Sequence, residues 1–246
     1  MALSYRLADP IGTAATLGLI VLQSDETLEA EFRQIFPQSD VATYVSRVPS
    51  AAEVTADTLA QMEAELPRAA GLLPPSVEFD VVGYGCTSGA TVIGPEAVHG
   101  LVRGVVFTRA VTEPLSAVCA AIAALGVRRI GVVSPYIAEV SAPLIAALEA
   151  SGVSVTASVS FDEMQEARVA RIDPGSSLEA GLEVGARDDV EAVFLSCTNL
   201  RTVGMLDELE ARLGKPAISS NQALAWHMAQ LAGVKPGRPI GRLMRP

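Results

Sequence analysis

The chain has 246 residues, half of them apolar and only 4% aromatic, and it carries a formal net charge of −10. This length suffices to bury an aliphatic core, either in one α/β domain or in two smaller ones. The negative charge excludes long-range attraction to nucleic acid or to an anionic membrane surface. A small anionic ligand is not excluded, because its binding depends on nearby hydrogen-bond donors and not on the net charge.

Short apolar runs alternate with helical patterns along the first half of the chain, which is typical of βαβ units and a parallel sheet. We expect strands at 17–22, 41–45 and 77–83 and helices at 26–36 and 55–70. The third strand runs directly into Gly85, Cys86, Thr87 and Ser88. It therefore delivers a cysteine to the end of a buried strand.

The same alternation continues in the second half, after a Gly-rich passage. We expect helices at 115–125, 141–150, 176–186 and 221–231 and strands at 129–134, 153–159, 192–196 and 216–219. Ser141 is the expected cap of its helix, with Pro143 tolerated in the first turn. The strand at 192–196 leads into Cys197, Thr198 and Asn199.

No segment has the pattern of a membrane anchor or a targeting signal. The longest uncharged apolar run, Pro114 to Val127, is shorter than the roughly 20 residues that a bilayer-spanning helix needs. The first ten residues lack the basic start and apolar stretch of a signal peptide. We therefore expect a cytoplasmic protein whose three cysteines remain thiols.

An internal duplication relates the two halves. Cys86 and Cys197 each stand six residues after an acidic residue, at the end of an apolar run, and each is followed by Thr. A similar pair of motifs surrounds Gly18 and Gly131, and both pairs are separated by about 110 residues, the size of a small domain.

We therefore expect an α/β fold of two pseudosymmetric lobes, each a parallel sheet flanked by helices. The first lobe would comprise residues 1–113 plus 218–246, and the second would comprise residues 114–217. A ligand site is expected in the cleft between the lobes.

The chemistry predicted for this cleft rests on the two duplicated cysteines. Each follows a strand at the carboxyl end of a parallel sheet, where ligands bind. Backbone amides at a helix start favour an anion, so we expect them to lower the thiol pKa and to help hold a carboxylate. The alternative is simple packing, which is the usual role of a lone buried cysteine. Cys119 is assigned to the core, because it shares a helical face with Leu115 and Ile122.

Two facing thiols suit a reaction that exchanges protons on opposite faces of one carbon. One thiolate removes a proton while the other thiol supplies one, or one thiolate adds to a double bond while the other protonates the neighbouring carbon. Neither route needs a metal or an organic cofactor. No CxxC pair occurs and the chain has only two histidines, so no metal site is expected.

At these residues the chain resembles the aspartate/glutamate racemase superfamily, in its maleate isomerase and arylmalonate decarboxylase branch, over nearly its whole length. Residues 85–88 and 195–199 resemble the two catalytic loops of that family. Residues 24–27 are similar to its first ligand loop, and 134–137 to the opening of the second lobe, whose tyrosine contacts substrate. Residues 218–221 are similar to its closing segment.

This resemblance implies an interlobe site without a cofactor and an oligomer of identical chains. Arylmalonate decarboxylases carry Gly where Cys86 stands and work with the second cysteine alone, so the presence of both favours isomerisation or racemisation. Maleate isomerases usually carry Asn where Asp25 stands and near where Glu163 stands. A carboxylate repels a dicarboxylate and welcomes an ammonium group, which makes the chain similar to the ectoine-utilisation racemase-like proteins.

The leading hypothesis is a cofactor-independent racemase or isomerase of a small carboxylate, amino-bearing if the acidic residues face it. The expected substrate-binding residues are Asp25, Thr87, Ser88, Tyr136, Glu163, Thr198 and Asn199. Asp25 has an alternative role as a helix cap, and Tyr136 as a wedge between the lobes. The competing hypotheses are a decarboxylase that uses Cys197, a maleate cis–trans isomerase, and a two-lobe protein that binds a ligand without turning it over.

Overall fold

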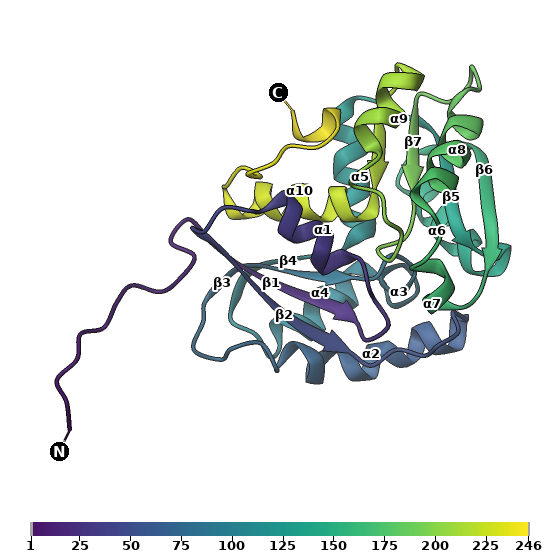
Figure 1. Cartoon of the computed structure of the whole chain (residues 1–246). Coiled ribbons are helices and arrows are strands. Elements are labelled where there is room, and N and C mark those ends of the chain that lie inside the picture. The colour runs from purple at the N-terminus through teal and green to yellow at the C-terminus, as the bar shows by residue number, and fades with distance from the viewer. Residues whose placement is uncertain (1, 246) are drawn as a thin grey trace.

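The computed structural model describes residues 2–245, which form two four-stranded parallel sheets with helices on their faces (Figure 1). The first sheet has the strand order β2-β1-β3-β4 and the second has the order β6-β5-β7-β8. These orders become identical when β1–β4 are matched to β5–β8, which confirms the predicted pair of pseudosymmetric lobes. The strand bounds are β1 Ala15–Leu22, β2 Val41–Val48, β3 Phe79–Gly85, β4 Thr108–Thr112, β5 Arg129–Tyr136, β6 Ser154–Glu163, β7 Ala192–Leu195 and β8 Ala217–Ser219.

The helices of the first half include two that were expected and two that were not. Their bounds are α1 Leu28–Ile35, α2 Ala56–Ala70, α3 Thr87–Ile93 and α4 Pro95–Arg103. A capping box fixes the start of α2, because Thr55 and Thr58 bond to each other's backbone amides. The helices α3 and α4 were missed because Gly94, at a φ of 90°, divides the Gly-rich passage into two short pieces.

Four of the six helices in the second half were expected, and each begins one to three residues earlier than predicted. The bounds of all six are α5 Pro114–Leu125, α6 Ala138–Ala150, α7 Glu166–Val169, α8 Pro174–Gly185, α9 Leu206–Leu213 and α10 Ser220–Ala232, followed by a 3₁₀ turn at Arg242–Met244. Of these, α7 and α9 were not expected. The prediction that Ser141 caps its helix is wrong, because α6 begins earlier and the Ser141 hydroxyl bonds Ser134 Oγ at 2.7 Å. Within residues 2–245, no helix combines the length and apolar character needed to cross a bilayer.

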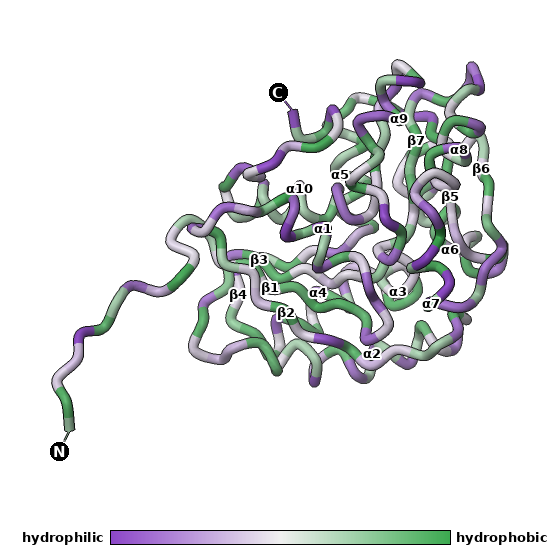
Figure 2. Tube along the Cα trace, viewed as in Figure 1, coloured by the Kyte–Doolittle hydropathy of each residue, from purple (hydrophilic) through white to green (hydrophobic). Residues whose placement is uncertain are grey.

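A continuous apolar core joins the two lobes. β1 and β3 are almost uniformly apolar, since both faces of the first sheet are covered (Figure 2). Leu19 and Val81 of the first sheet lie in one buried cluster with Leu195 of the second. Gly83 approaches α10 so closely that a Cβ there would lie 2.6 Å from the sulfur of Met228. The lobes are therefore packed together along an apolar seam.

The chain changes lobe between β8 and α10. β8 pairs with β7, so residues 217–219 lie in the second sheet, although the predicted first lobe resumed at residue 218. α10 follows directly and packs against β3 of the first sheet and against α5 (Figure 1). This arrangement places the start of α10 beside the carboxyl ends of β3 and β7, where both duplicated cysteines lie.

Candidate active site

The structure brings the two duplicated cysteines into one buried cluster. Cys86 follows β3 and caps α3, and its sulfur accepts a hydrogen bond from the Gly89 amide at 3.2 Å. Cys197 follows β7, and its sulfur accepts from the Asn199 amide, also at 3.2 Å. The side chains are only 5% and 3% exposed and share one hydrophobic cluster. Equivalent strands of the two lobes thus present equivalent thiols to one place.

Hydroxyl groups tie the two cysteine loops to each other. Thr87 Oγ1 donates to Ser220 Oγ at 2.8 Å, and Ser220 Oγ accepts from the Cys197 amide at 3.2 Å. Thr198 Oγ1 donates to the Gly85 carbonyl at 3.2 Å. The hydroxyls of Thr87 and Thr198, predicted as substrate ligands, therefore hold the loops together, and their contact with substrate stays a prediction. Ser88 lies buried in the first turn of α3, next to these loops.

A hydrogen-bonded chain of side chains leads away from Cys197. The Tyr136 hydroxyl lies 3.1 Å from Cys197 Sγ and donates to Glu166 Oε1 at 2.6 Å. Glu166 Oε2 accepts from Asn199 Nδ2 at 2.8 Å. Tyr136 and Glu166 are 6% and 3% exposed, so this chain is shielded from bulk water. Tyr136 therefore touches the predicted reactive group directly, while also packing between the lobes.

The two oxygens of Asp25 have different surroundings. Oδ1 accepts from the amides of Thr27 and Leu28, both at 2.8 Å, and so orders the start of α1. Oδ2 is buried and has no hydrogen-bond partner among the described residues. Burial raises the pKa of Asp25 to about 7, and the charge of Glu166 adds to this rise. One oxygen thus bonds the backbone at the start of α1, although the N-cap residue itself is Thr27, and the other oxygen has no donor.

Two of the predicted substrate ligands, Glu163 and Asn199, form hydrogen bonds with other parts of the protein. Glu163 is not part of the cluster: it pairs with Arg168 and accepts from the amides of Met164 and Gln165. The acid in the site is instead Glu166, which no sequence motif marked. The Asn199 side chain is fully used by the protein, because Oδ1 accepts from the Glu26 amide at 2.9 Å and Nδ2 donates to Glu166.

Glu163 lies outside the cluster because the end of β6 is irregular. The pairing of β5 with β6 shifts register beyond Ser134, and Asp162 has a φ of 56°. This left-handed residue redirects the chain, so that the acid facing Tyr136 comes from the first turn of α7.

The expectation of lowered thiol pKa values is wrong. Burial raises the pKa of Cys86 to about 12 and raises that of Cys197 well above its usual range. The amides of Gly89 and Asn199 act in the opposite direction, but the charge of Glu166 opposes ionisation of both thiols. A charge placed in this buried cluster must therefore be compensated within the cluster.

Cys119 lies at the edge of the core and not within it. The side chain is half-buried, lines a surface hollow and lies 3.4 Å from Ser151 Oγ. Cys119 lies apart from the other two cysteines, because it packs against the hydrophobic cluster around α5.

Two loops from different lobes close over the thiols. Val54 donates from its amide to the Met164 carbonyl at 3.0 Å, and Glu166 donates from its amide to the Ala52 carbonyl at 3.1 Å. Glu53 and Gln165 form an antiparallel bridge between these strands of chain. The cavity that remains beside Glu166 is about 10 Å³, too small for a substrate.

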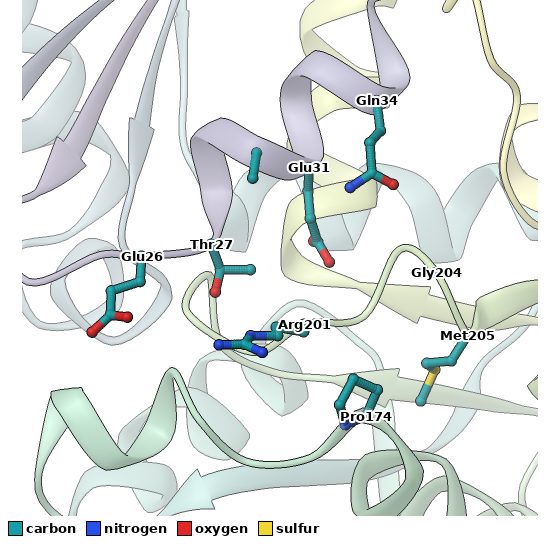
Figure 3. Close-up of a pocket in the computed structure, with 9 residues that line it drawn as sticks. Glu26, Thr27, Glu31, Gln34, Pro174, Arg201, Gly204 and Met205 are labelled. Carbon is teal, nitrogen blue, oxygen red and sulfur yellow. The ribbon is translucent and has the colours of Figure 1, made fainter.

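A larger cavity of about 230 Å³ lies between α1 and the segments that carry Pro174 and Arg201 (Figure 3). Glu31 forms part of its wall and accepts from the amides of Thr202 and Val203 at 2.7 and 2.8 Å. The Thr27 hydroxyl, also in the wall, donates to the Asn199 carbonyl at 2.9 Å. This cavity borders the structural supports of the cysteine loops and contains neither thiol. Across residues 2–245, no group of three potential metal ligands is present.

Comparison with known proteins agrees with this architecture. The sequence model of the arylmalonate decarboxylase family matches residues 108–244. The arylmalonate decarboxylase of Bordetella bronchiseptica is 33% identical over 137 residues, which are 54% of this chain and 56% of that protein, so the match spans about half of the relative. The maleate isomerase of Geobacillus stearothermophilus is 24% identical over 89% of this chain and 92% of that relative.

Solved structures extend the similarity to the whole fold. The maleate isomerase Iso from Pseudomonas putida S16 superposes with a TM-score of 0.84 at 22% identity, over 94% of this chain and 98% of that one. Unliganded arylmalonate decarboxylase superposes with a TM-score of 0.75 at 26% identity, over 94% and 98% of the two chains. The first lobe, which lies mostly outside the matched family segment, therefore shares the same architecture.

Proposed function

Because this chain belongs to the arylmalonate decarboxylase family, we propose that it is a racemase or isomerase of a small carboxylate that relies on Cys86 and Cys197. The observation that carries the proposal is the convergence of two equivalent, buried thiols from two equivalent lobes. Packing alone does not require matched Cys-Thr loops that are cross-tied through Ser220.

In the proposed reaction the two thiols act on opposite faces of one substrate carbon. One thiolate removes the proton next to the carboxylate, and the electron pair moves into the carboxylate to give an enediolate. The other thiol then protonates the same carbon from the opposite side and becomes the thiolate. The same pair serves cis–trans isomerisation if one thiolate adds to a double bond and the other thiol protonates the adjacent carbon; after rotation about the new single bond, the second thiolate takes a proton back from that carbon as the C–S bond breaks, which restores the double bond and the first thiolate. Protons and charge balance in both routes without a cofactor.

The finer proposal is that the substrate carries an amino group. Asp25 Oδ2 is buried without a donor, and the carboxylate of Glu166 lies close enough to raise the pKa of Asp25 after burial has done so. An ammonium group would supply the missing donor and the missing positive charge together. A second carboxylate on the substrate would instead meet like charge.

Maleate cis–trans isomerisation is the second candidate, supported by the maleate isomerase relatives that align over most of this chain. Decarboxylation by Cys197 alone is the less favoured reaction, because it gives Cys86 no task. A small carboxylate partner, a homo-oligomeric state and a cytoplasmic location complete the proposal.

The test is hydrogen exchange in heavy water across amino acids, acetylated diamino acids and dicarboxylates, without added cofactor. We expect one of these classes to be interconverted with incorporation of deuterium at the reacting carbon. Cys86→Ser and Cys197→Ser should each abolish the interconversion, whereas Cys119→Ser, the matched control, should leave it intact. Interconversion that survives either of the first two substitutions would overturn the proposal.

A further inference from the structure

Residues 2–11 leave the body of the protein as an extended arm, and every one of them is exposed (Figure 1). Leu3, Tyr5 and Leu7 are 86%, 82% and 90% exposed. They alternate with Ser4 and Arg6, so the three apolar side chains share one face of the extended chain. This alternation is typical of a half-buried strand, whereas segments that stay disordered are poor in apolar residues. The arm therefore has the pattern of a strand that belongs in a sheet.

The first sheet has one edge suited to such a strand. β2 is the outermost strand of that sheet and, within residues 2–245, pairs with β1 alone. Its eight residues keep a single register with β1 from end to end, and none of them is proline. Half of the backbone N–H and C=O groups of a strand point to each side, so the outer side of β2 presents a regular row of groups ready to pair.

The other three sheet edges are protected against the addition of a strand. β4 and β8 are short, with five and three residues. β6 is long, but its pairing with β5 shifts register twice, and Asp162 near its end has a φ of 56°. Short length and local irregularity are the usual ways in which an edge strand is blocked. The edge of β2 has neither.

A hollow of about 230 Å³ lies beside this edge, between β2 and α1. We call it the edge groove; its walls include Phe32 and Phe36 of α1 and Val41, Thr43 and Val45 of β2. The three β2 positions are two residues apart, which is also the spacing within the apolar face of the arm. A strand added beside β2 at the matching register therefore lays that face over the groove.

We propose that the arm of one molecule adds as a further strand to the β2 edge of a second copy of this chain, with Leu3, Tyr5 and Leu7 over the edge groove. The arm's own sheet is the less favoured acceptor, because the root of the arm is held in place and the chain then runs away from the body (Figure 1). The amides of Ala14 and Ala15 both donate to the Asp40 carbonyl, at 2.9 and 3.4 Å.

Exchange in both directions gives a two-fold symmetric dimer in which both arms and both β2 edges are covered. The inference gives an interface to the homo-oligomeric state proposed above and does not depend on the chemistry of the thiols. Main-chain hydrogen bonds of an added strand supply affinity, and its alternate side chains supply specificity.

The distribution of charge favours contact through the arm. The whole chain carries a net charge of −10, so the bodies of two copies repel each other. Residues 2–11 contain one positive and one negative side chain, Arg6 and Asp9, and are neutral overall. A neutral extended segment reaches the partner while the two acidic bodies stay apart, and screening by salt weakens the repulsion that remains.

Size-exclusion chromatography with light scattering tests the dimer. The wild type should be a dimer, and deletion of residues 2–11 should raise the dissociation constant at least 100-fold. Val45→Lys, which places a charge in the edge groove at a side chain that is already 40% exposed, should do the same. Leu72→Lys is the matched control, because Leu72 is an exposed apolar residue outside the groove, and it should keep the wild-type mass. A monomeric wild type, or a dimer that survives deletion of the arm, would overturn the inference.

A photo-crosslinking group in the arm tests which molecule receives it. Tyr5→p-benzoylphenylalanine is equilibrated with isotope-labelled wild type, irradiated, digested and analysed by mass spectrometry. We expect crosslinks to labelled peptides from residues 29–48. Crosslinks confined to unlabelled peptides would assign the arm to its own sheet, and labelled peptides from elsewhere would assign it to another surface; either result contradicts the inference. Absence of substrate exchange by the wild type would instead count against the thiol chemistry alone, so the two failures are distinguishable.

Discussion

The loop that ends in Cys86 and the loop that ends in Cys197 have the same backbone plan but different chemical surroundings. In each, a sulfur follows a central strand and accepts one backbone hydrogen bond, from Gly89 or Asn199. Each sulfur also has a neighbouring tyrosine hydroxyl, but Tyr84 bonds a thioether, the Met62 sulfur, whereas Tyr136 donates to a carboxylate, that of Glu166. Duplication thus explains the positions of two like groups, and later divergence explains how they could take unlike roles.

The largest expected effect comes from replacing the thiols one at a time. Cys197→Ser should stop interconversion, a loss of at least about 1000-fold, because no other group serves its face of the substrate carbon. Cys86→Ser should stop interconversion equally, and in each variant the remaining thiol should still exchange a proton on its own face with retention of configuration. Chiral chromatography with mass detection separates these outcomes. Interconversion that survives either substitution would contradict the assignment of one thiol to each face.

A smaller effect is expected from disturbing the Cys86 loop alone. In Gly89→Ala the new Cβ would lie 2.6 Å from the Tyr84 hydroxyl oxygen and 2.9 Å from Cys86 Sγ, so one of them must move. A displaced reacting group can lower kcat about 100-fold, and we expect a loss of that order with little change in alkylation of Cys197. Gly100→Ala is the control, because nothing lies within 4 Å of a Cβ there. A wild-type rate in Gly89→Ala would show that the position of Cys86 is not critical.

The smallest effect concerns the acid beside Cys86. The pKa of Asp25 rises from 3.8 to about 7 on folding, so the native state binds this proton more tightly than the unfolded state. Stability from this group is therefore fully present below pH 3.8 and is lost as the pH rises to about 7. Asp25→Asn keeps an acceptor for the α1 amides, and it should stabilise the protein by about 2 kcal/mol at pH 8 and by little at pH 4.

Urea unfolding at the two pH values measures this difference. Asp207→Asn should show the opposite trend, because pairing with Arg245 lowers the pKa of Asp207. An Asp25→Asn variant that is equally destabilised at both pH values would mean that the carboxylate serves only as a cap.

The sequence predicted well that the two cysteine loops meet, because the signals for them are local and repeated. A buried strand, a cysteine and a threonine recur in both halves, and parallel-sheet geometry brings such strand ends together. Glu166 was not predicted, because it follows an irregular strand end. An ungapped count of residues there does not identify which acidic side chain faces the site, and it selected Glu163. The contact between the loops at 52–54 and 164–166 was also not predicted, because these segments are far apart in the sequence.

Short elements were the other source of error in the predicted fold. α7 has only four residues, too few to show a helical period, whereas α9 was overlooked although Leu206 and Leu209 have helical spacing. Long buried strands such as β1 and β5 gave clear patterns, because burial on both faces demands uninterrupted apolar residues.

The position of α10 means that the duplicated halves are no longer separable units. This helix leaves a strand of one sheet and lays Leu224 and Met228 against the other, where Gly83 makes room for it. A fragment of residues 1–113 would leave Leu19 and Val81 facing water without that cover. An ancestral half-sized protein would have needed a second copy to supply the missing helix, and fusion of the copies makes that exchange permanent within a single polypeptide.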